Sequence, residues 1–442
     1  ASAILKLVLI KLDTSGNVQW QKKYGIGTWS TYNSVKQTPD GGYIVAGALN
    51  KNTGTLDDVY VMKTDSAGFI CWSKTFDGGM SYWDNGLAID LTKDGGYIIA
   101  GFSNYNDDVP PFSNQDGFVI RLDASGNEIW RKTFAYSGHD WFSAIHQLPN
   151  GEYIIAGGSD KGGLNNSDMW LLKLNENGDS LWSRRFGGGN DDGAWDMQIT
   201  SDNGYILCGH TKSFGTVGIR DVYLVKTDSI GDTMWTKTYG GTNSDAGHSV
   251  KQTSDGGYII TGYTVSFSAG ITDVYLIKTD ANGNPIWTKT YGGTQGDVGW
   301  SVQQTIDGGY VIAGSTASFP PGSIDVYLIK TDFIGDTIWT KIYGGTNFDQ
   351  GYSVHQTTDG GYIILGRTLS FGAGLIDIYL LKTDTNGNIL WSKTYGGGGN
   401  DYGWEVVQTL DGGYIITGRT NSFGAGLIDI YLLKTDTNGN IL

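Results

Sequence analysis

The chain has few basic residues, and it lacks any long apolar segment. Its 30 lysine and arginine residues are outnumbered by 45 aspartate and glutamate residues, which gives a net charge of −15. Nucleic-acid binding needs a basic patch, so we expect no nucleic-acid partner. No apolar run approaches the ~18 residues of a membrane-spanning helix, and we therefore expect no membrane insertion.

Cysteine and proline are also scarce, at 2 and 7 of 442 residues. Cys71 and Cys208 lie in strand-like runs of different repeats, where we expect small buried apolar residues and no disulfide. In contrast, the chain contains 69 glycine, 26 tyrosine and 15 tryptophan residues. Disordered chains are poor in aromatic residues, so this composition favours a folded protein rich in strands and turns.

A tryptophan in the phrase G-x-x-x-W-x-K-x-Y/F marks an internal repeat. Successive copies are 52 or 53 residues apart, except for one gap of 58 residues. One unit contains four short β-type runs, at 248–253, 258–264, 273–280 and 285–292, which we call strands a to d. Four-stranded units at this period predict an all-β fold, an eight-bladed β-propeller of four-stranded antiparallel blades. We expect each repeated tryptophan to be structural: Trp20, Trp72, Trp130, Trp182, Trp235, Trp287, Trp339 and Trp391.

The two ends of the chain predict how the ring closes. The sequence begins with a strand c and a strand d and ends on a strand c. We predict that the N-terminal strand around Trp20 completes the last blade, which leaves one surplus strand c that is displaced, disordered or paired with another molecule. We expect residues 1–442 to form a single propeller domain and to be a fragment of a longer secreted protein.

A glycine recurs four residues after the tyrosine that opens strand b, for example Gly262 after Tyr258 and Gly314 after Tyr310. A glycine inside a strand usually marks a bulge or a close approach of another group. We interpret it as room for an aromatic side chain of the neighbouring blade, such as the tryptophan of strand d.

The pattern D-x-x-G-x-x-x-W, seen in TDTNGNILW and TDSIGDTMW, resembles the tryptophan-docking repeat of quinoprotein-dehydrogenase-like propellers. The whole unit more closely resembles the repeats of uncharacterised secreted propeller proteins of bacteria and archaea. The resemblance covers the whole chain and implies a propeller fold and an extracellular or cell-surface location. The quinoproteins use adjacent cysteines over their cofactor, and this chain has no such pair, so we expect no quinone cofactor.

Candidate binding residues lie on the face with the longer d–a and b–c loops. Five consecutive repeats carry an aromatic residue or histidine near the start of strand a, and an aspartate precedes strand a in most repeats. Stacking on a ligand or attraction of cations would be functional roles, whereas packing over the blade ends or stabilising a turn would be structural ones. The predicted ligand-binding residues are Trp195, His248, Trp300, Tyr352, Trp404, Asp245, Asp297, Asp349 and Asp401.

No catalytic residue, metal site or cofactor is predicted. Binding of Ca²⁺ is kept as an alternative, because the turns at Asp280, Asp384 and Asp436 resemble the start of a calcium loop. They lack the closing glutamate of that loop, which favours simple hairpin turns. We predict a non-enzymatic binding or structural scaffold for protein or polysaccharide. One alternative is a propeller enzyme, either a quinoprotein-like oxidoreductase or a polysaccharide-active hydrolase or lyase. The other is a self-assembling subunit of a surface filament or lattice.

Overall fold

The structure is a computed structural model. It describes residues 5–12, 18–27, 29–50, 57–76, 84–105, 114–136, 138–160, 166–216, 218–319, 322–408, 412–420, 422, 429–435 and 437–438. Side chains are described from residue 34 onward, with further gaps near strand ends and in the last sheet. All regular elements within these ranges are β-strands, and they include no helix able to span a membrane.

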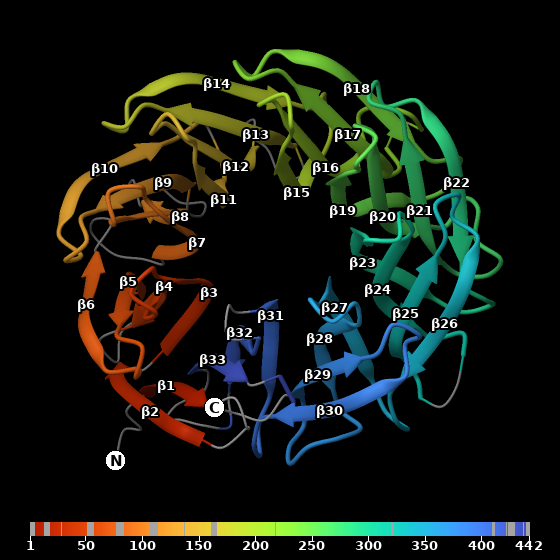
Figure 1. Cartoon of the computed structure of the whole chain (residues 1–442). Coiled ribbons are helices and arrows are strands. Elements are labelled where there is room, and N and C mark those ends of the chain that lie inside the picture. The colour runs from red at the N-terminus through yellow and green to blue at the C-terminus, as the bar shows by residue number, and fades with distance from the viewer. Residues whose placement is uncertain are drawn as a thin grey trace.

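Seven four-stranded antiparallel sheets and one five-stranded sheet form a ring, with the first strand of each repeat innermost and the fourth on the rim (Figure 1). Sheet 1 contains β3 (Trp29–Gln37), β4 (Tyr43–Asn50), β5 (Asp57–Thr64) and β6 (Ile70–Phe76). Sheet 2 contains β7 (Asp84–Leu91), β8 (Tyr97–Tyr105), β9 (Asn114–Leu122) and β10 (Glu128–Phe134). Sheet 3 contains β11 (Asp140–Gln147), β12 (Tyr153–Asp160), β13 (Ser167–Leu174) and β14 (Ser180–Phe186). Sheet 4 contains β15 (Asp192–Ile199), β16 (Tyr205–Thr211), β17 (Asp221–Thr227) and β18 (Thr233–Tyr239).

The remaining sheets continue this order around the ring. Sheet 5 contains β19 (Asp245–Gln252), β20 (Tyr258–Thr264), β21 (Asp273–Thr279) and β22 (Pro285–Tyr291). Sheet 6 contains β23 (Asp297–Gln304), β24 (Tyr310–Thr316), β25 (Asp325–Thr331) and β26 (Thr337–Tyr343). Sheet 7 contains β27 (Asp349–Gln356), β28 (Tyr362–Thr368), β29 (Asp377–Thr383) and β30 (Ile389–Tyr395). Sheet 8 contains β31 (Asp401–Gln408), β32 (Tyr414–Thr420), β33 (Asp429–Thr435), β1 (Leu5–Leu12) and β2 (Val18–Gly27).

The hydrophobic core lies between successive sheets. In β21, Leu276 packs with Val302 and Ile312 of sheet 6, whereas Ile277 of the same strand packs with Cys208 of sheet 4. Because both faces of the strand are covered, all seven residues of β21 are buried. This two-sided burial explains why the third run of each repeat is almost continuously apolar.

Sheet 8 combines both ends of the chain, but in an order that differs from the prediction. Strand β1 pairs in parallel with β33, with Leu9 opposite Leu432, and it pairs antiparallel with β2 on its other side. The strand of Trp20 therefore does not pair directly with the last strand c, and the surplus strand β1 is incorporated in the sheet. The side chain of Trp20 lies outside the described residues.

The glycine of strand b has a different role from the predicted one. The pairing of β23 with β24 shifts between Gly299 and Ser301, which leaves Trp300 as the extra residue of a β-bulge. A Cβ atom on Gly314 would lie 2.0 Å from the main-chain oxygen of Val298, in the bulged strand itself. The glycine thus accommodates the bulge of its own sheet, and not an aromatic ring of the next one.

The repeated tryptophans dock onto the next sheet at a different glycine. The Trp235 ring lies 5.8 Å from the ring of Tyr258, and a Cβ atom on Gly283, in the c–d turn of sheet 5, would lie 2.7 Å from that indole. Trp130 also donates a hydrogen bond to the Glu176 carbonyl, at 3.0 Å. The half-buried tryptophans that contact the next sheet in this way are Trp72, Trp130, Trp182, Trp235, Trp287 and Trp339, and Trp391 contacts Tyr414.

A buried lysine in strand c and an aspartate in the a–b turn form a second repeated contact. Lys278 Nζ lies 2.9 Å from Asp255 Oδ2 and donates to the Thr279 carbonyl at 2.8 Å. Partial burial raises the pKa of Asp255, but hydrogen bonds from Thr253 and Lys278 outweigh burial and lower it to about 2. The same pair recurs as Lys63–Asp40, Lys226–Asp202, Lys330–Asp307 and Lys382–Asp359, with Arg121–Asp94 in sheet 2.

Candidate binding site at the centre of the ring

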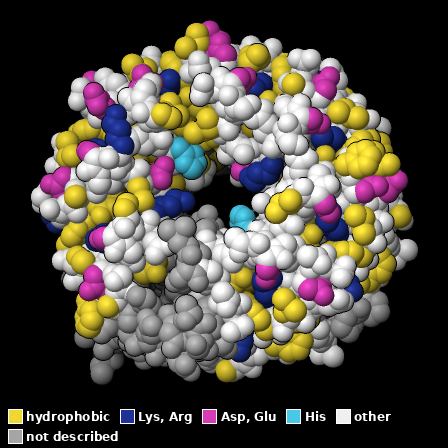
Figure 2. All heavy atoms as spheres, viewed as in Figure 1, with side chains coloured by type: hydrophobic (Ala, Val, Ile, Leu, Met, Phe, Trp, Pro, Cys, Tyr) yellow, Lys and Arg dark blue, Asp and Glu magenta, His cyan; other side chains and the backbone are white. Residues whose placement is uncertain are grey.

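The β-bulge of the innermost strand places one residue of each sheet beside the centre of the ring. Figure 2 shows that the molecule is hollowed there, with histidine and basic side chains beside the hollow. The bulge residue is aromatic or histidine in five successive sheets, and we call this set the aromatic arc. Its members are Trp195, His248, Trp300, Tyr352 and Trp404.

Three rings of the aromatic arc are nearly parallel. The His248 ring lies 4.3 Å from Trp195 at an angle of 3° and 4.2 Å from Trp300 at 5°. His248 Nδ1 is 2.9 Å from the Gly299 carbonyl, so a protonated Nδ1 donates to sheet 6. Burial lowers the pKa of His248 to about 4 despite that hydrogen bond, and the ring is therefore neutral at pH 7.

The other half of the aromatic arc is less regular. Tyr352 lies 6.3 Å from Trp300 at 68° and 6.3 Å from Trp404 at 38°. Trp404 is also stacked with Tyr402, at 6.0 Å and 7°. The two ends of the arc are accessible, since Trp195 is 46% exposed and Trp404 is 44% exposed, whereas His248 in the middle is 7% exposed.

Arg367 adds a positive charge to the Tyr352 side of the arc. Its guanidinium lies 4.7 Å above the ring of Phe348 and 5.6 Å above that of Tyr352, distances typical of cation–π contacts. Arg367 Nη2 and the Tyr352 hydroxyl both donate to Gln350 Oε1, at 2.9 and 3.0 Å. The guanidinium is thus held in place beside two aromatic faces.

A charged cluster beside Trp195 was missed by the sequence analysis. Asp191 Oδ2 lies 3.2 Å from His210 Nε2, 3.2 Å from Lys212 Nζ and 3.8 Å from an Arg220 nitrogen. Burial raises the pKa of Asp191, but hydrogen bonds, led by those from Ser167 and His210, lower it to about 2. The signal available in the sequence was the asymmetry of the repeat, because the positions of Asp191 and Lys212 carry different residues in the other units.

The opposite side of the ring carries no aromatic residue at the described bulge positions. Leu87 occupies this position in sheet 2 and Ser143 in sheet 3, while the side chain of Asn33 in sheet 1 lies outside the described residues. The aromatic arc therefore makes the centre of the ring chemically asymmetric, although the backbone repeats.

The four predicted binding aspartates do not line the surface with the aromatic arc. Asp245, Asp297, Asp349 and Asp401 are all fully buried. Asp297 Oδ2 accepts hydrogen bonds from the Gly293 amide at 2.9 Å and from the Ser318 hydroxyl at 2.6 Å. These carboxylates join the d–a turn to the b–c loop of the same sheet.

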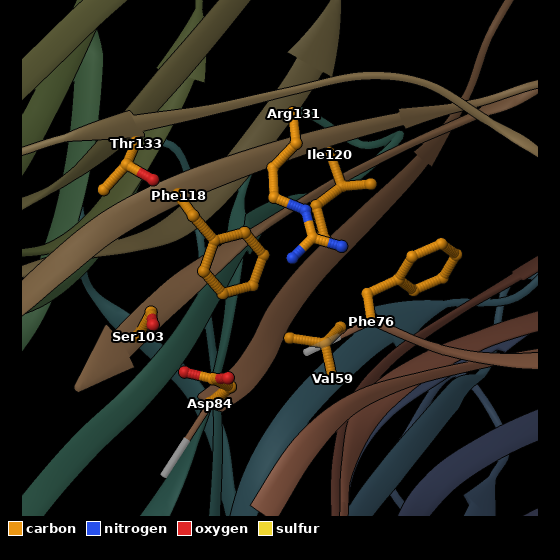
Figure 3. A pocket seen from close by; sticks show the side chains of 8 residues that line it. All are labelled: Val59, Phe76, Asp84, Ser103, Phe118, Ile120, Arg131 and Thr133. Carbon is orange, nitrogen blue, oxygen red and sulfur yellow. The ribbon is translucent and has the colours of Figure 1, made fainter. Parts of the chain in front are cut away.

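Neither the turns at Asp280 and Asp384 nor the histidines form a metal site among the described residues, where no group of three or more His, Cys, Asp and Glu side chains converges. Asp280 Oδ1 accepts the amides of Asn282 and Asn284, at 2.9 and 2.8 Å, as in a hairpin turn. Asp436 lies outside the described residues. A cavity of about 20 Å³ beside Asp84 and Arg131, between sheets 1 and 2, has room for about one water molecule (Figure 3).

The arrangement of sheets defines the class of this protein: it is a β-propeller. A solved structure of Sqt1 from Chaetomium thermophilum is similar over 92% of this chain and 96% of that one, with a TM-score of 0.56 at 10% identity. The Pan2 WD40 domain of Neurospora crassa covers 79% of this chain and 88% of its own, with a TM-score of 0.43 at 10% identity. At 10% identity the likeness to Sqt1 concerns the fold alone.

The sequence comparisons do not define a family. No family model matches the chain. The regulatory protein FlaEY of Caulobacter vibrioides is 26% identical over 204 residues, which cover 40% of this chain and 21% of that protein. The match thus spans about a fifth of the length of that relative. The resemblance to quinoprotein-like propellers stays a prediction, and so does the enzymatic alternative.

Proposed function

We propose that this chain is an extracellular, non-enzymatic binding scaffold whose aromatic arc takes a polysaccharide or a segment of a partner protein at the centre of the ring. The observation that carries the proposal is the exposure of Trp195 and Trp404, 46% and 44%, at the two ends of the arc. Amphipathic rings of this kind, partly wet and held on a rigid scaffold, suit a binding surface.

The polar groups beside the arc support the same role. Arg367 and the Asp191 cluster offer charged and hydrogen-bonding groups on either side of the rings. A few placed polar groups among aromatic side chains are what orient a bound ligand. Binding at the arc therefore requires a ligand with both a flat apolar face and polar substituents, a description that fits sugar rings and aromatic or amide-bearing peptide side chains.

Binding to a glycan array and to a peptide library, followed by titration calorimetry, tests the proposal. We expect Trp195→Ala and Trp404→Ala to weaken binding of the captured ligand at least tenfold, because each removes an exposed stacking face. Phe333→Ala is the matched control, since Phe333 is 68% exposed in a c–d turn away from the arc. Equal affinity of all three variants and the unmodified chain would exclude the arc as the binding surface.

The extracellular location rests on the resemblance to secreted propeller proteins, and fractionation of the source cells tests it. The alternative of self-assembly by strand exchange relied on an unpaired surplus strand. Within the chain β1 is paired with both β33 and β2, so assembly between molecules would have to break one of these pairings or add a strand to the edge strand β2, and it stays an untested alternative.

A further inference from the structure

Two buried aspartates face each other where successive sheets meet. Asp325 begins β25 of sheet 6, Asp349 begins β27 of sheet 7, and both are fully buried. Gly344 separates them: a Cβ atom on this glycine would lie 2.0 Å from Asp325 Oδ1 and 2.7 Å from Asp349 Oδ2. These two oxygen atoms are therefore less than about 5 Å apart, close enough for one metal ion to bind both.

In both carboxylates Oδ2 accepts hydrogen bonds, whereas the buried Oδ1 has no hydrogen-bond partner among the described residues. Asp349 Oδ2 accepts the Gly345 amide at 2.8 Å and the Ser370 hydroxyl at 2.5 Å. Asp325 Oδ2 accepts the Gly322 amide at 2.8 Å, but the buried Oδ1 atom, on the side of Asp349, has no hydrogen-bond partner among the described residues. Burial first, and then the charge of Asp349, raise the pKa of Asp325.

Main-chain oxygen atoms complete the surroundings of Asp325 Oδ1. The position that a Cβ atom on Gly322 would take is 2.9 Å from Asp325 Oδ1, 2.7 Å from the Gly345 carbonyl and 2.4 Å from the Asn347 carbonyl. The Gly345 and Asn347 carbonyl oxygens therefore lie less than about 6 Å from Asp325 Oδ1, beside a residue that has no side chain. Carboxylate and carbonyl oxygens at about 2.3–2.6 Å are the ligands that Ca²⁺ prefers in proteins.

The same arrangement recurs around the ring. Three further pairs place an aspartate of strand c beside the aspartate of the next strand a, with a glycine between them. In each pair the buried Oδ1 of the strand c aspartate has no hydrogen-bond partner in the part of the chain that the structure describes. The pairs are Asp221–Asp245, Asp273–Asp297 and Asp377–Asp401. A buried unpaired carboxylate is costly, so a structure that repeats the pair needs a means of neutralising it.

We propose that the Asp325–Asp349 pair and its repeats bind Ca²⁺, with one carboxylate from each of two successive sheets and main-chain carbonyls of the d–a turn as ligands. The ion would join neighbouring sheets on the face of the longer loops. Ca²⁺ fits this set better than Zn²⁺, which favours nitrogen and sulfur ligands, and better than Mg²⁺, which keeps several of its waters.

Equilibrium dialysis of the EDTA-treated chain against Ca²⁺ at pH 7.5 tests the proposal. We expect saturable binding and the loss of one bound Ca²⁺ per chain in Asp325→Asn and in Asp349→Asn. Asp384→Asn is the control, because Asp384 lies in an exposed turn where it accepts the amides of Asn386 and Asn388, and it should bind as many ions as the unmodified chain. Circular dichroism shows whether each variant is folded.

Thermal unfolding of the unmodified chain supplies a second measurement that needs no variant. Ca²⁺ should raise the midpoint, and the same concentration of Mg²⁺ should raise it less. No saturable binding up to about 10 mM Ca²⁺, tenfold above the weakest extracellular sites, would overturn the proposal. Unchanged stoichiometry in both folded Asp→Asn variants would also overturn it, because the bound Ca²⁺ would then lie elsewhere in the chain.

Discussion

Two junctions between sheets are built from the same repeat but differ in one hydrogen bond: the junction of sheets 5 and 6, and that of sheets 1 and 2. In the first, Gln304 Oε1 accepts the main-chain amide of Ser254 in the a–b turn of the neighbouring sheet, at 2.8 Å. In the second, Leu91 takes the place of the glutamine and Pro39, which has no amide hydrogen, takes the place of the serine. A cavity of about 410 Å³, lined by both residues, lies there.

The residue at the end of the innermost strand and the turn residue that faces it in the preceding sheet change together. A glutamine at the end of the innermost strand accepts the turn amide of the preceding sheet in Gln147–Lys93, Gln252–Ser201, Gln304–Ser254, Gln356–Ile306 and Gln408–Thr358. Where the turn residue is proline, at Pro39 and Pro149, the facing residue is Leu91 or Ile199. Donor and acceptor are thus lost together, which avoids a polar group without a partner.

The largest effect should come from the docked tryptophans. Trp287 packs on the Gly335 turn and lies 5.8 Å from the Tyr310 ring, so Trp287→Ala should lower the free energy of unfolding by about 2–4 kcal/mol, somewhat below the full value for a buried tryptophan. Trp72 lines the open cavity, so Trp72→Ala should cost less. Urea unfolding measures both, and equal losses would show that the cavity does not weaken the contact.

The pH dependence of stability should distinguish the junction of sheets 7 and 8. Burial, opposed by main-chain hydrogen bonds and reinforced by Asp401, raises the pKa of Asp377 to about 6. A raised pKa stabilises the fold below about pH 4, and that contribution, of order 1–3 kcal/mol, is lost as the pH rises through 6. The aspartates with pKa values of about 2, such as Asp255, stabilise the fold fully above about pH 4 and lose that contribution only as the pH falls towards 2, outside this range.

Unfolding in EDTA between pH 4 and 8 measures this slope. Asp377→Asn should flatten it and should raise stability at pH 7.5, because the amide carries no charge. A slope that persists unchanged in this folded variant would assign the titration to another group.

The repeat made most of the fold predictable, because a period of about 52 residues and four β-type runs per unit leave few architectures. The order of sheet 8 was not predictable, since nothing in the residues of β1 distinguishes a parallel pairing with β33 from displacement. The sequence pattern identified the residues of the aromatic arc, but it did not predict that three of their rings stack in parallel. The Asp191 cluster was missed because its members are separated in the sequence and meet only through the pairing of β15 with β16 and the b–c loop.

The glutamine contact offers a smaller and more direct test of the comparison. Gln304→Leu should lower stability by about 0.5–1.5 kcal/mol, the usual value of one hydrogen bond, because the Ser254 amide loses its protein partner. The paired change Pro39→Ser with Leu91→Gln should raise stability by a similar amount. Leu91→Gln alone, which leaves the new amide group facing proline, should gain nothing, and a gain equal to that of the pair would contradict the coupling.

The smallest effect concerns Cys71, which reports on the same junction without altering the fold, with Cys208 in sheet 4 as a reference. The expected burial holds for Cys208 but is wrong for Cys71, which is exposed and lines the cavity between sheets 1 and 2. Burial raises the pKa of the Cys208 thiol, so a thiol reagent should label one cysteine per native chain, identified by mass spectrometry. Because the paired change Pro39→Ser with Leu91→Gln should draw the two sheets together, it should slow labelling of Cys71 severalfold, and an unchanged rate would mean that the cavity does not depend on the missing hydrogen bond.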